Sequence, residues 1–250
     1  MQTSEYKTLH DYESWYWWYI SQRANLTAAV ADLSLSVGAR LLDAGCGTGR
    51  NLIELARLLP IQAYGVDSSR HAAALWNGDG RVQRCVGSVN EIPHPNGFFD
   101  VVVSVDVLGC HGVDISRAIA EMVRVMCPGG YLVLLVPAYQ WMRSRHDAAV
   151  HSVHRFTRHG LTALVREAGL TVLRATHRFT LLFPFIAGLR LLRRAVRSTC
   201  SASAVSDLRP LPSWLNRGLL GIVRAEQWLL GRWSVPFGST ILLVARKAPP

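Results

Sequence analysis

Apolar residues along this 250-residue chain follow two alternating patterns. Short continuous apolar runs are typical of strands buried on both faces of a parallel sheet, whereas apolar positions three to four residues apart indicate amphipathic helices. The continuous runs predict strands at residues 39–45, 62–67, 81–87, 99–108, 131–137, 170–179 and 239–247. The helical spacing predicts helices at residues 20–33, 50–59, 69–76, 115–126 and 157–169. Strands that alternate with helices favour an α/β fold of the Rossmann-like, doubly wound kind, with a mainly parallel sheet covered on both faces.

This rhythm breaks between the last two predicted strands. Apolar spacing there predicts helices at residues 188–198 and 214–233, joined by a loop at residues 198–212. The longest apolar stretch, residues 179–192, contains Pro184 and Arg190 and is shorter than the roughly 20 residues that span a bilayer. We divide the chain into an aromatic, helical lid segment, a core, a helical insertion and a last strand with tail, at residues 1–36, 37–180, 181–237 and 238–250.

Composition narrows the classes of partner. Lys and Arg number 27 against 17 Asp and Glu, a net charge of +10 that favours an anionic partner, with a solvated basic face as the alternative. No nucleic-acid-binding motif occurs, so we expect no nucleic-acid partner. Five cysteines without a Cys-x-x-Cys pair, and a polar start unlike a signal peptide, predict a reduced cytoplasmic protein.

The stretch "LLDAGCGTGRN", residues 41–51, carries the clearest chemistry. Its three glycines, Gly45, Gly47 and Gly49, follow a buried strand and open a helix. Such a bare turn lets a ligand approach the backbone at the positive end of a helix. Asp67 ends the next strand, where a carboxylate can bind both ribose hydroxyls. Asp43 would repel a pyrophosphate but suits a cationic amino-acid tail, so the stretch predicts a nucleoside cradle.

Further motifs extend this pattern. "LLDAGCGTGRN", "GVDSS", "GSVNEIPHPNGFFDVVVSVDVL" and "EMVRVMCPGGYLVLLVP" occur in the order found in class I S-adenosylmethionine-dependent methyltransferases, which the chain resembles over residues 39–137. More loosely, "WYWWYISQR" and "VPAYQWMRSRHD" are similar to bacterial methyltransferase type 11 proteins. The resemblance implies a seven-stranded sheet with an antiparallel last strand, S-adenosylmethionine as cofactor and S-adenosylhomocysteine as product.

The resemblance also implies roles for individual residues. Asp43 and the turn at Gly45, Cys46 and Gly47 would hold the amino-acid part of the cofactor, and Asp67 its ribose. The residues expected around the adenine and beside the methyl group are Ser68, Ser88, Val89, Asp106 and Val107. Purely structural roles are the alternatives, above all helix capping for Asp43 and core packing for Val107.

Histidines supply candidates for a general base. An unperturbed histidine titrates near pH 6.5, so we expect His146 first, then His151 or His111, to deprotonate the acceptor, with a solvated loop as the alternative. The cluster around "HDAAVHSVH" lacks a cysteine, and we predict no metal there.

Together these features predict a methyltransferase that acts on an oxygen, nitrogen or carbon of a small, apolar acceptor, in natural product biosynthesis or lipid modification. The alternative is a protein of the same fold that binds S-adenosylmethionine or S-adenosylhomocysteine without transferring the methyl group. The insertion, with apolar faces beside Arg190, Arg193 and Arg194, is a substrate cap, a peripheral membrane contact or a homodimer helix.

Overall fold

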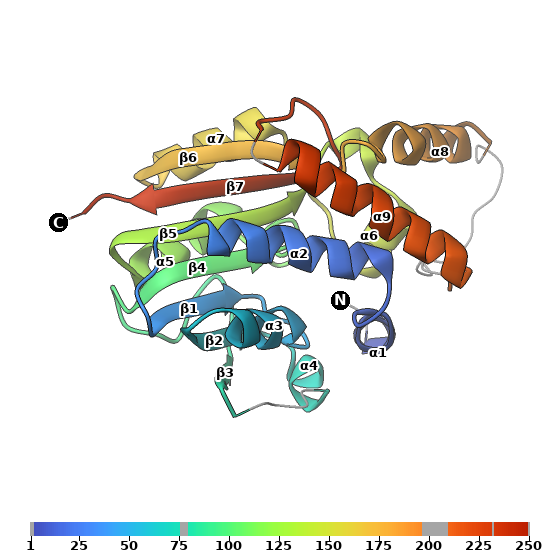
Figure 1. Cartoon of the computed structure of the whole chain (residues 1–250). Helices are drawn as coiled ribbons and strands as arrows, with labels where there is room; N and C mark the ends of the chain where they lie inside the picture. The colour runs from blue at the N-terminus through green and yellow to red at the C-terminus, as the bar shows by residue number, and fades with distance from the viewer. Residues whose placement is uncertain (1–2, 76–79, 197–209, 232, 250) are drawn as a thin grey trace.

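The computed structural model describes residues 3–75, 80–196, 210–231 and 233–249. Its centre is a seven-stranded sheet in the order β3-β2-β1-β4-β5-β7-β6 (Figure 1). Strand β7 runs antiparallel to both β5 and β6, while the pairs from β3 to β5 are parallel, which confirms the predicted sheet. The strands are β1 (Ala39–Ala44), β2 (Ile61–Asp67), β3 (Val82–Val86), β4 (Phe99–Val105), β5 (Met126–Pro137), β6 (Leu170–Arg178) and β7 (Thr240–Lys247).

Helices cover both faces of the sheet. On one face α2 and α3 pack through Leu26 and Leu52, and on the other α5 and α7 pack through Ile119 and Leu161. Successive residues of β5 point to opposite sides, so that both faces need apolar side chains, which explains the continuous apolar run. The described helices are α1 (Thr3–Tyr12), α2 (Trp17–Ala31), α3 (Arg50–Leu58), α4 (Arg70–Ala74), α5 (Ile115–Val125), η1 (Gln140–Met142), α6 (Arg145–Ala149), α7 (Arg158–Glu167), α8 (Phe183–Val196) and α9 (Ser213–Leu230).

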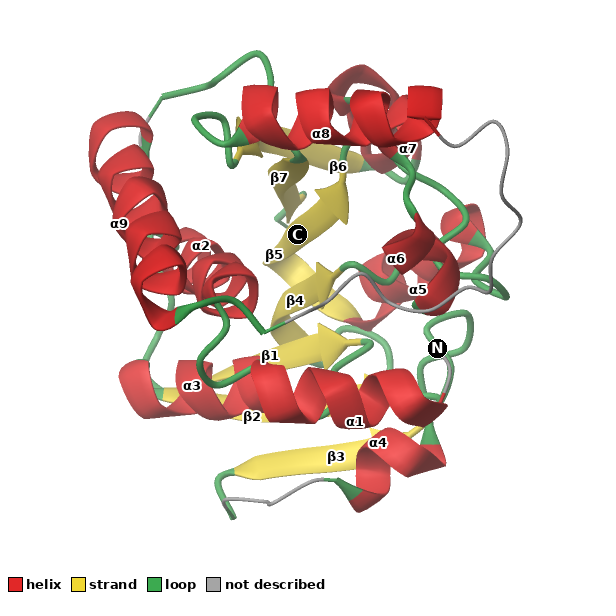
Figure 2. Cartoon of the chain, turned by 90° about the vertical axis from the view of Figure 1, so that its right-hand side faces the viewer, coloured by secondary structure: helices red, strands yellow, loops and turns green. Residues whose placement is uncertain are grey.

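The segment between β6 and β7 contains the two expected helices. Helix α8 begins just after β6 ends, and α9 ends shortly before β7 begins, so both join the sheet at the edge where its parallel strands end. Figure 2 faces this carboxyl edge and shows α9 beside α2, with α8 near the end of β6. Most of the loop predicted at residues 198–212 lies outside the described residues. Within the described part of the chain, no helix has the length and apolarity needed to cross a membrane.

Candidate active site

The glycine turn connects β1 to α3. Gly45, Gly47 and Gly49 have φ angles of +92°, +53° and +78°, in the left-handed region that side chains disfavour. A Cβ atom on Gly45 would lie 2.2 Å from a methyl carbon of Val107, so the turn packs directly against the end of β4. The N–H groups of Gly45 and Cys46 both donate to the Val66 carbonyl, which fixes the turn to β2.

Asp43 lies under this turn as an unpaired buried carboxylate. Its side chain is only 1% exposed, and neither carboxylate oxygen has a hydrogen-bond partner among the described residues. Burial, and then the nearby charge of Asp67, raise the pKa of Asp43 to about 7. A buried carboxylate without a partner is costly, and a cationic ligand group would remove that cost. The alternative of a helix-capping role for Asp43 lacks support, because neither carboxylate oxygen accepts a hydrogen bond among the described residues.

Asp67, at the end of β2, ties the turn to the next loop. Its two oxygens accept hydrogen bonds from the N–H groups of Gly47 and Ser69, each at 2.8 Å. Each carboxylate oxygen has two lone pairs, so Asp67 retains acceptor capacity for hydroxyl groups. The half-buried carboxylate therefore both shapes the turn and faces the carboxyl edge, where ligands bind in open α/β sheets.

Asp106, the first residue after β4, faces the same edge. Its backbone is left-handed, with a φ angle of 57°, and the Gln22 side chain of α2 donates to its carboxylate at 3.0 Å. Protein surrounds Asp106 closely enough for desolvation to raise its pKa to about 6, yet solvent still reaches the side chain. Asp106 therefore lies close to other protein atoms and is still reached by solvent. The Oε1 atom of Gln22, beside it, is buried without a hydrogen-bond partner among the described residues.

The N-terminal helices cover the turn. Helix α1 runs across the ends of β1 and β2 (Figure 2). The Thr48 hydroxyl of the turn donates to Glu13, and Arg23 of α2 donates to the Glu13 carbonyl at 2.8 Å. Burial is the main cause that raises the pKa of Glu13. The Nε atom of Arg50, at the start of α3, is buried without a hydrogen-bond partner and adds a cation to this corner.

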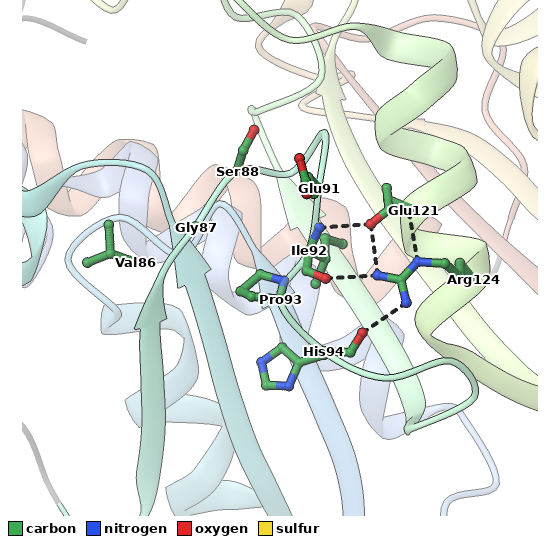
Figure 3. Close-up of a pocket in the computed structure, with 9 residues that line it drawn as sticks. All are labelled: Val86, Gly87, Ser88, Glu91, Ile92, Pro93, His94, Glu121 and Arg124. Carbon is green, nitrogen blue, oxygen red and sulfur yellow. Dashed lines mark hydrogen bonds and ion pairs between the residues drawn. The ribbon is translucent and has the colours of Figure 1, made fainter.

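The residues expected around the adenine lie at the same edge. Ser68 and Ser88 are exposed, and Val89 is buried, as is Cys46 of the turn expected to hold the amino-acid part of the cofactor. A surface hollow of about 550 Å³ borders Ser88 (Figure 3). Every N–H group of Arg124 there already donates to a neighbouring oxygen. Arg124 therefore holds the loop after β3 and has no N–H group left to donate to a ligand in the hollow.

The structure brings two of the three predicted histidines together. His111 donates its backbone N–H to the His151 carbonyl at 2.8 Å, and both side chains are exposed. The side chain of His146 lies outside the described residues, although its backbone belongs to α6. Among the described residues, no group of three histidine, cysteine or acidic side chains is arranged to hold a metal ion.

The acid that follows His146 has a structural role. Asp147 accepts two hydrogen bonds from Ser144 and forms a 2.8 Å ion pair with Arg155, and both members of the pair are buried. Arg155 also donates to the Ala138 carbonyl just after β5. The pair therefore fixes the histidine-rich segment against the end of β5.

Sequence reasoning missed a tyrosine and a histidine at this edge. The Tyr139 hydroxyl lies 3.1 Å from His177 Nε2, and His177 Nδ1 lies 3.1 Å from the Val235 carbonyl. A carbonyl only accepts, so Nδ1 carries the proton and Nε2 accepts from the Tyr139 hydroxyl. His177 is buried, which lowers its pKa, whereas Tyr139 is half-buried and packs against Trp141 and Phe183.

A family model described as a methyltransferase domain matches residues 42–134. This span runs from β1 through β5 and includes the turn, Asp43, Asp67 and Asp106. The match agrees with the motifs that the sequence analysis identified in the same region.

Curated relatives are similar over part of their length. The chain is 33% identical over 136 residues to the ubiquinone/menaquinone biosynthesis C-methyltransferase UbiE of Geobacter sulfurreducens, covering 50% of this chain and 52% of that protein. It is 31% identical over 158 residues to the 27-O-demethylrifamycin SV methyltransferase of Amycolatopsis mediterranei, covering 55% and 56%. The chain thus spans about half the length of these relatives.

Solved structures share the fold. The [4+2]-cyclase SpnF superposes with a TM-score of 0.58 at 24% identity, covering 90% of this chain and 80% of that one. A geranyl diphosphate methyltransferase in complex with geranyl diphosphate and sinefungin superposes with a TM-score of 0.58 at 17% identity, covering 90% and 77%. At these identities the likeness establishes the fold alone.

Proposed function

Because residues 42–134 match a methyltransferase domain model and the chain has the class I fold, we propose that it transfers a methyl group from S-adenosylmethionine to a small, apolar acceptor. One observation carries this proposal. Asp43 is a buried carboxylate without a hydrogen-bond partner in the described part of the chain, directly below a glycine turn whose neighbouring strand ends in Asp67. A nucleoside ligand with a cationic amino-acid tail satisfies both acids.

The residues around the turn fit this cofactor. Asp43 faces the cationic tail, Asp67 accepts from the ribose, and Arg50 at the start of α3 attracts the carboxylate. We assign the remaining contacts to the turn, the adenine side and the methyl side, at Gly45, Cys46, Gly47, Ser68, Ser88, Val89, Asp106 and Val107. When bound, the sulfonium supplies an electrophilic methyl group.

The chain's own contribution to the reaction is placement and shielding. Intramolecular alignment of reactants contributes about 7 kcal/mol or more, so a rigid cleft is sufficient for much of the rate. Helix α1 covers the turn, because the Thr48 hydroxyl donates to Glu13 just after the helix and Leu9 lies against Gly47. We propose that this N-terminal segment is a lid over the cofactor.

A hydroxyl or amine acceptor must also lose a proton. Tyr139, beside Trp141 and Phe183, offers an apolar wall with a polar tip, and His177 behind it can take the phenol proton as the phenol takes one from the acceptor. His111 and His151 remain alternative bases at the neighbouring loop, and His146 a third. The names of the relatives, which cover O-, N- and C-methyltransferases, favour transfer over a role as a non-methylating binding protein.

Two measurements test this function. Calorimetry with S-adenosylhomocysteine should show binding to the wild type and a loss of at least tenfold in affinity for Asp67→Asn, while Asp32→Asn, a distant exposed control, binds normally. Incubation with methyl-labelled S-adenosylmethionine and an apolar extract should then transfer label to the organic phase. Tight binding without any transfer would support the non-methylating alternative, and absence of binding would refute the proposal. We also propose, as the sequence predicted, that the protein acts in the cytoplasm and forms a homodimer.

A further inference from the structure

Helix α9 buries two polar side chains beside Val223, while several of its large apolar side chains lie outside. Asn216 and Glu226 are buried, at 8% and 2% exposure. The Asn216 side chain accepts from the Trp17 N–H and donates to the Trp15 carbonyl, each at 2.9 Å. Glu226 accepts from the Leu181 N–H, also at 2.9 Å. These polar groups therefore attach α9 to the starts of α2 and α8.

The outward face of α9 is apolar. Trp214 is 70% exposed, Trp228 85%, Leu229 53% and Ile222 40%. Residues that recur every three to four positions lie on one side of a helix, and the positions between these four on that side are Gly218, Gly221 and Ala225. Trp233, just beyond the helix, is also 70% exposed. Exposed apolar stripes of this extent are uncommon on soluble monomers and mark interaction surfaces.

Positive charge borders this face. Arg217 and Arg224 are exposed and lie seven residues apart, along one edge of the stripe. The only acid in α9 is Glu226, which is buried and points inward. Residues 181–237 contain eight arginines and two acids in a chain of net charge +10. Among the described residues, Arg217 and Arg224 give the border of the stripe a positive charge, which suits an anionic partner.

We propose that the outward face of α9 binds an anionic membrane surface, with the helix lying flat in the headgroup layer. Such interfacial helices combine a tryptophan-containing apolar face with a basic border, and tryptophan favours the headgroup level. An 18-residue helix offers about 27 Å of contact length. A second copy of the chain is the weaker occupant, because it would bring two basic borders and two charges of +10 together.

Binding there would place the proposed active site beside lipid. Helix α9 packs along α2, and Gln22 of α2 donates to Asp106 at the carboxyl edge. Figure 2 shows α9 flanking this edge of the sheet. An apolar acceptor dissolved in the bilayer would then have a short path to the site, a consequence that rests on the proposed function, whereas the binding itself does not.

Flotation of the full chain with vesicles tests the proposal. The wild type should float with phosphatidylcholine vesicles containing 30% phosphatidylglycerol and bind vesicles of pure phosphatidylcholine at least tenfold more weakly. Trp214→Ser/Trp228→Ser should reduce binding to the anionic vesicles at least tenfold. Arg217→Gln/Arg224→Gln should reduce it by roughly 25-fold, because each basic residue near such a surface contributes a factor of about five.

Matched variants separate this face from general hydrophobicity and charge. Leu58→Ser/Leu173→Ser removes exposed apolar residues elsewhere, and Arg57→Gln/Arg166→Gln removes the same charge elsewhere. Both controls should bind vesicles like the wild type. Circular dichroism verifies that each variant folds. If Trp214→Ser/Trp228→Ser unfolds, the result with Arg217→Gln/Arg224→Gln alone tests the proposal.

Equal flotation of the α9 variants and the wild type would overturn the proposal, as would no flotation of the wild type. A concentration-dependent dimer in sedimentation that Trp228→Ser dissociates, without vesicle binding, would assign the face to a second copy instead. Calorimetry with S-adenosylhomocysteine on the same variants keeps the tests apart, because a chain that binds cofactor but not vesicles contradicts only the membrane surface.

Discussion

The variant Asp43→Asn tests two separate effects of the buried carboxylate: its destabilisation of the folded chain and its contribution to cofactor affinity. The pKa of Asp43 is about 7 in the folded chain, against an ordinary value of 3.8. Between these values the folded state holds a proton that the unfolded state has lost, so stability falls as pH rises from about 4 to 7. At 1.36 kcal/mol per pKa unit, the carboxylate costs about 2 kcal/mol at pH 5 and about 4 kcal/mol at pH 8.

The Asp43→Asn variant loses this pH dependence. Its uncharged amide, left without a partner, costs about 1–3 kcal/mol at every pH. The unfolding free energy of the variant relative to the wild type should therefore rise by about 2.5 kcal/mol between pH 5 and pH 8. Urea unfolding followed by circular dichroism at both pH values measures this difference, with Asp32→Asn as the control. Parallel pH curves for variant and wild type would show that the Asp43 carboxylate is not an unpaired buried charge.

Cofactor binding should change in the opposite direction. Removing one member of a buried charge pair costs about 2 kcal/mol or more, so Asp43→Asn should bind S-adenosylmethionine at least roughly thirtyfold more weakly at pH 8. Wild-type affinity should rise with pH up to about 7, as Asp43 loses its proton. Calorimetry across this range decides the point. A variant that is more stable at pH 8 yet binds with wild-type affinity would leave Asp43 without a role in the site.

Three further substitutions test separate parts of the site. Gly45→Ala would place a Cβ 2.2 Å from Val107 at a positive φ angle, and thermal melting should show a loss of about 1–3 kcal/mol together with weaker S-adenosylhomocysteine binding; an unchanged melting temperature would contradict the tight turn. Tyr139→Phe should lower kcat and flatten its pH profile for a hydroxyl acceptor, while calorimetric S-adenosylhomocysteine affinity stays constant; a full kcat would exclude the phenol. Asp147→Ala should reduce the urea unfolding free energy by about 3–5 kcal/mol because Arg155 stays buried without its partner, and a smaller loss would mean that water reaches Arg155.

The sheet could be predicted because the continuous apolar runs of its central strands indicate that both faces are buried. The run from Tyr131 to Pro137 supplies apolar side chains alternately to two cores, which only a central strand requires. Residues 127–130, which lie between the predicted helix and the predicted strand, also belong to β5. Their pairing depends on the chain end, since Gly129 donates to the Ala248 carbonyl and Arg246 donates back to the Gly129 carbonyl. A partner more than 100 residues away leaves no local signal.

The positions of the acids were predictable, but their surroundings were not. Asp43 and Asp67 end neighbouring strands, so any parallel sheet brings them to one edge. That Asp43 lacks a partner while Asp67 holds the turn depends on exact backbone geometry. His177 gave no signal at all, because it lies within a strand and its partners, Tyr139 and Val235, are 38 and 58 residues away.

Helix α9 shows why periodicity alone does not identify the exposed face, because apolar residues lie on both sides of it. An apolar stripe normally predicts the buried side of a helix. The first turn of a helix leaves backbone N–H groups without intrahelical acceptors, and in α2 the Trp17 N–H donates to the Asn216 side chain. Just before α8, the Leu181 N–H donates to the Glu226 carboxylate. Burying these two side chains forces Trp214 and Trp228, on the opposite side of the helix, to face outward. The polar anchors thus fix which face of α9 is exposed, and the position of the tryptophans is a consequence of hydrogen bonds that only the folded chain makes.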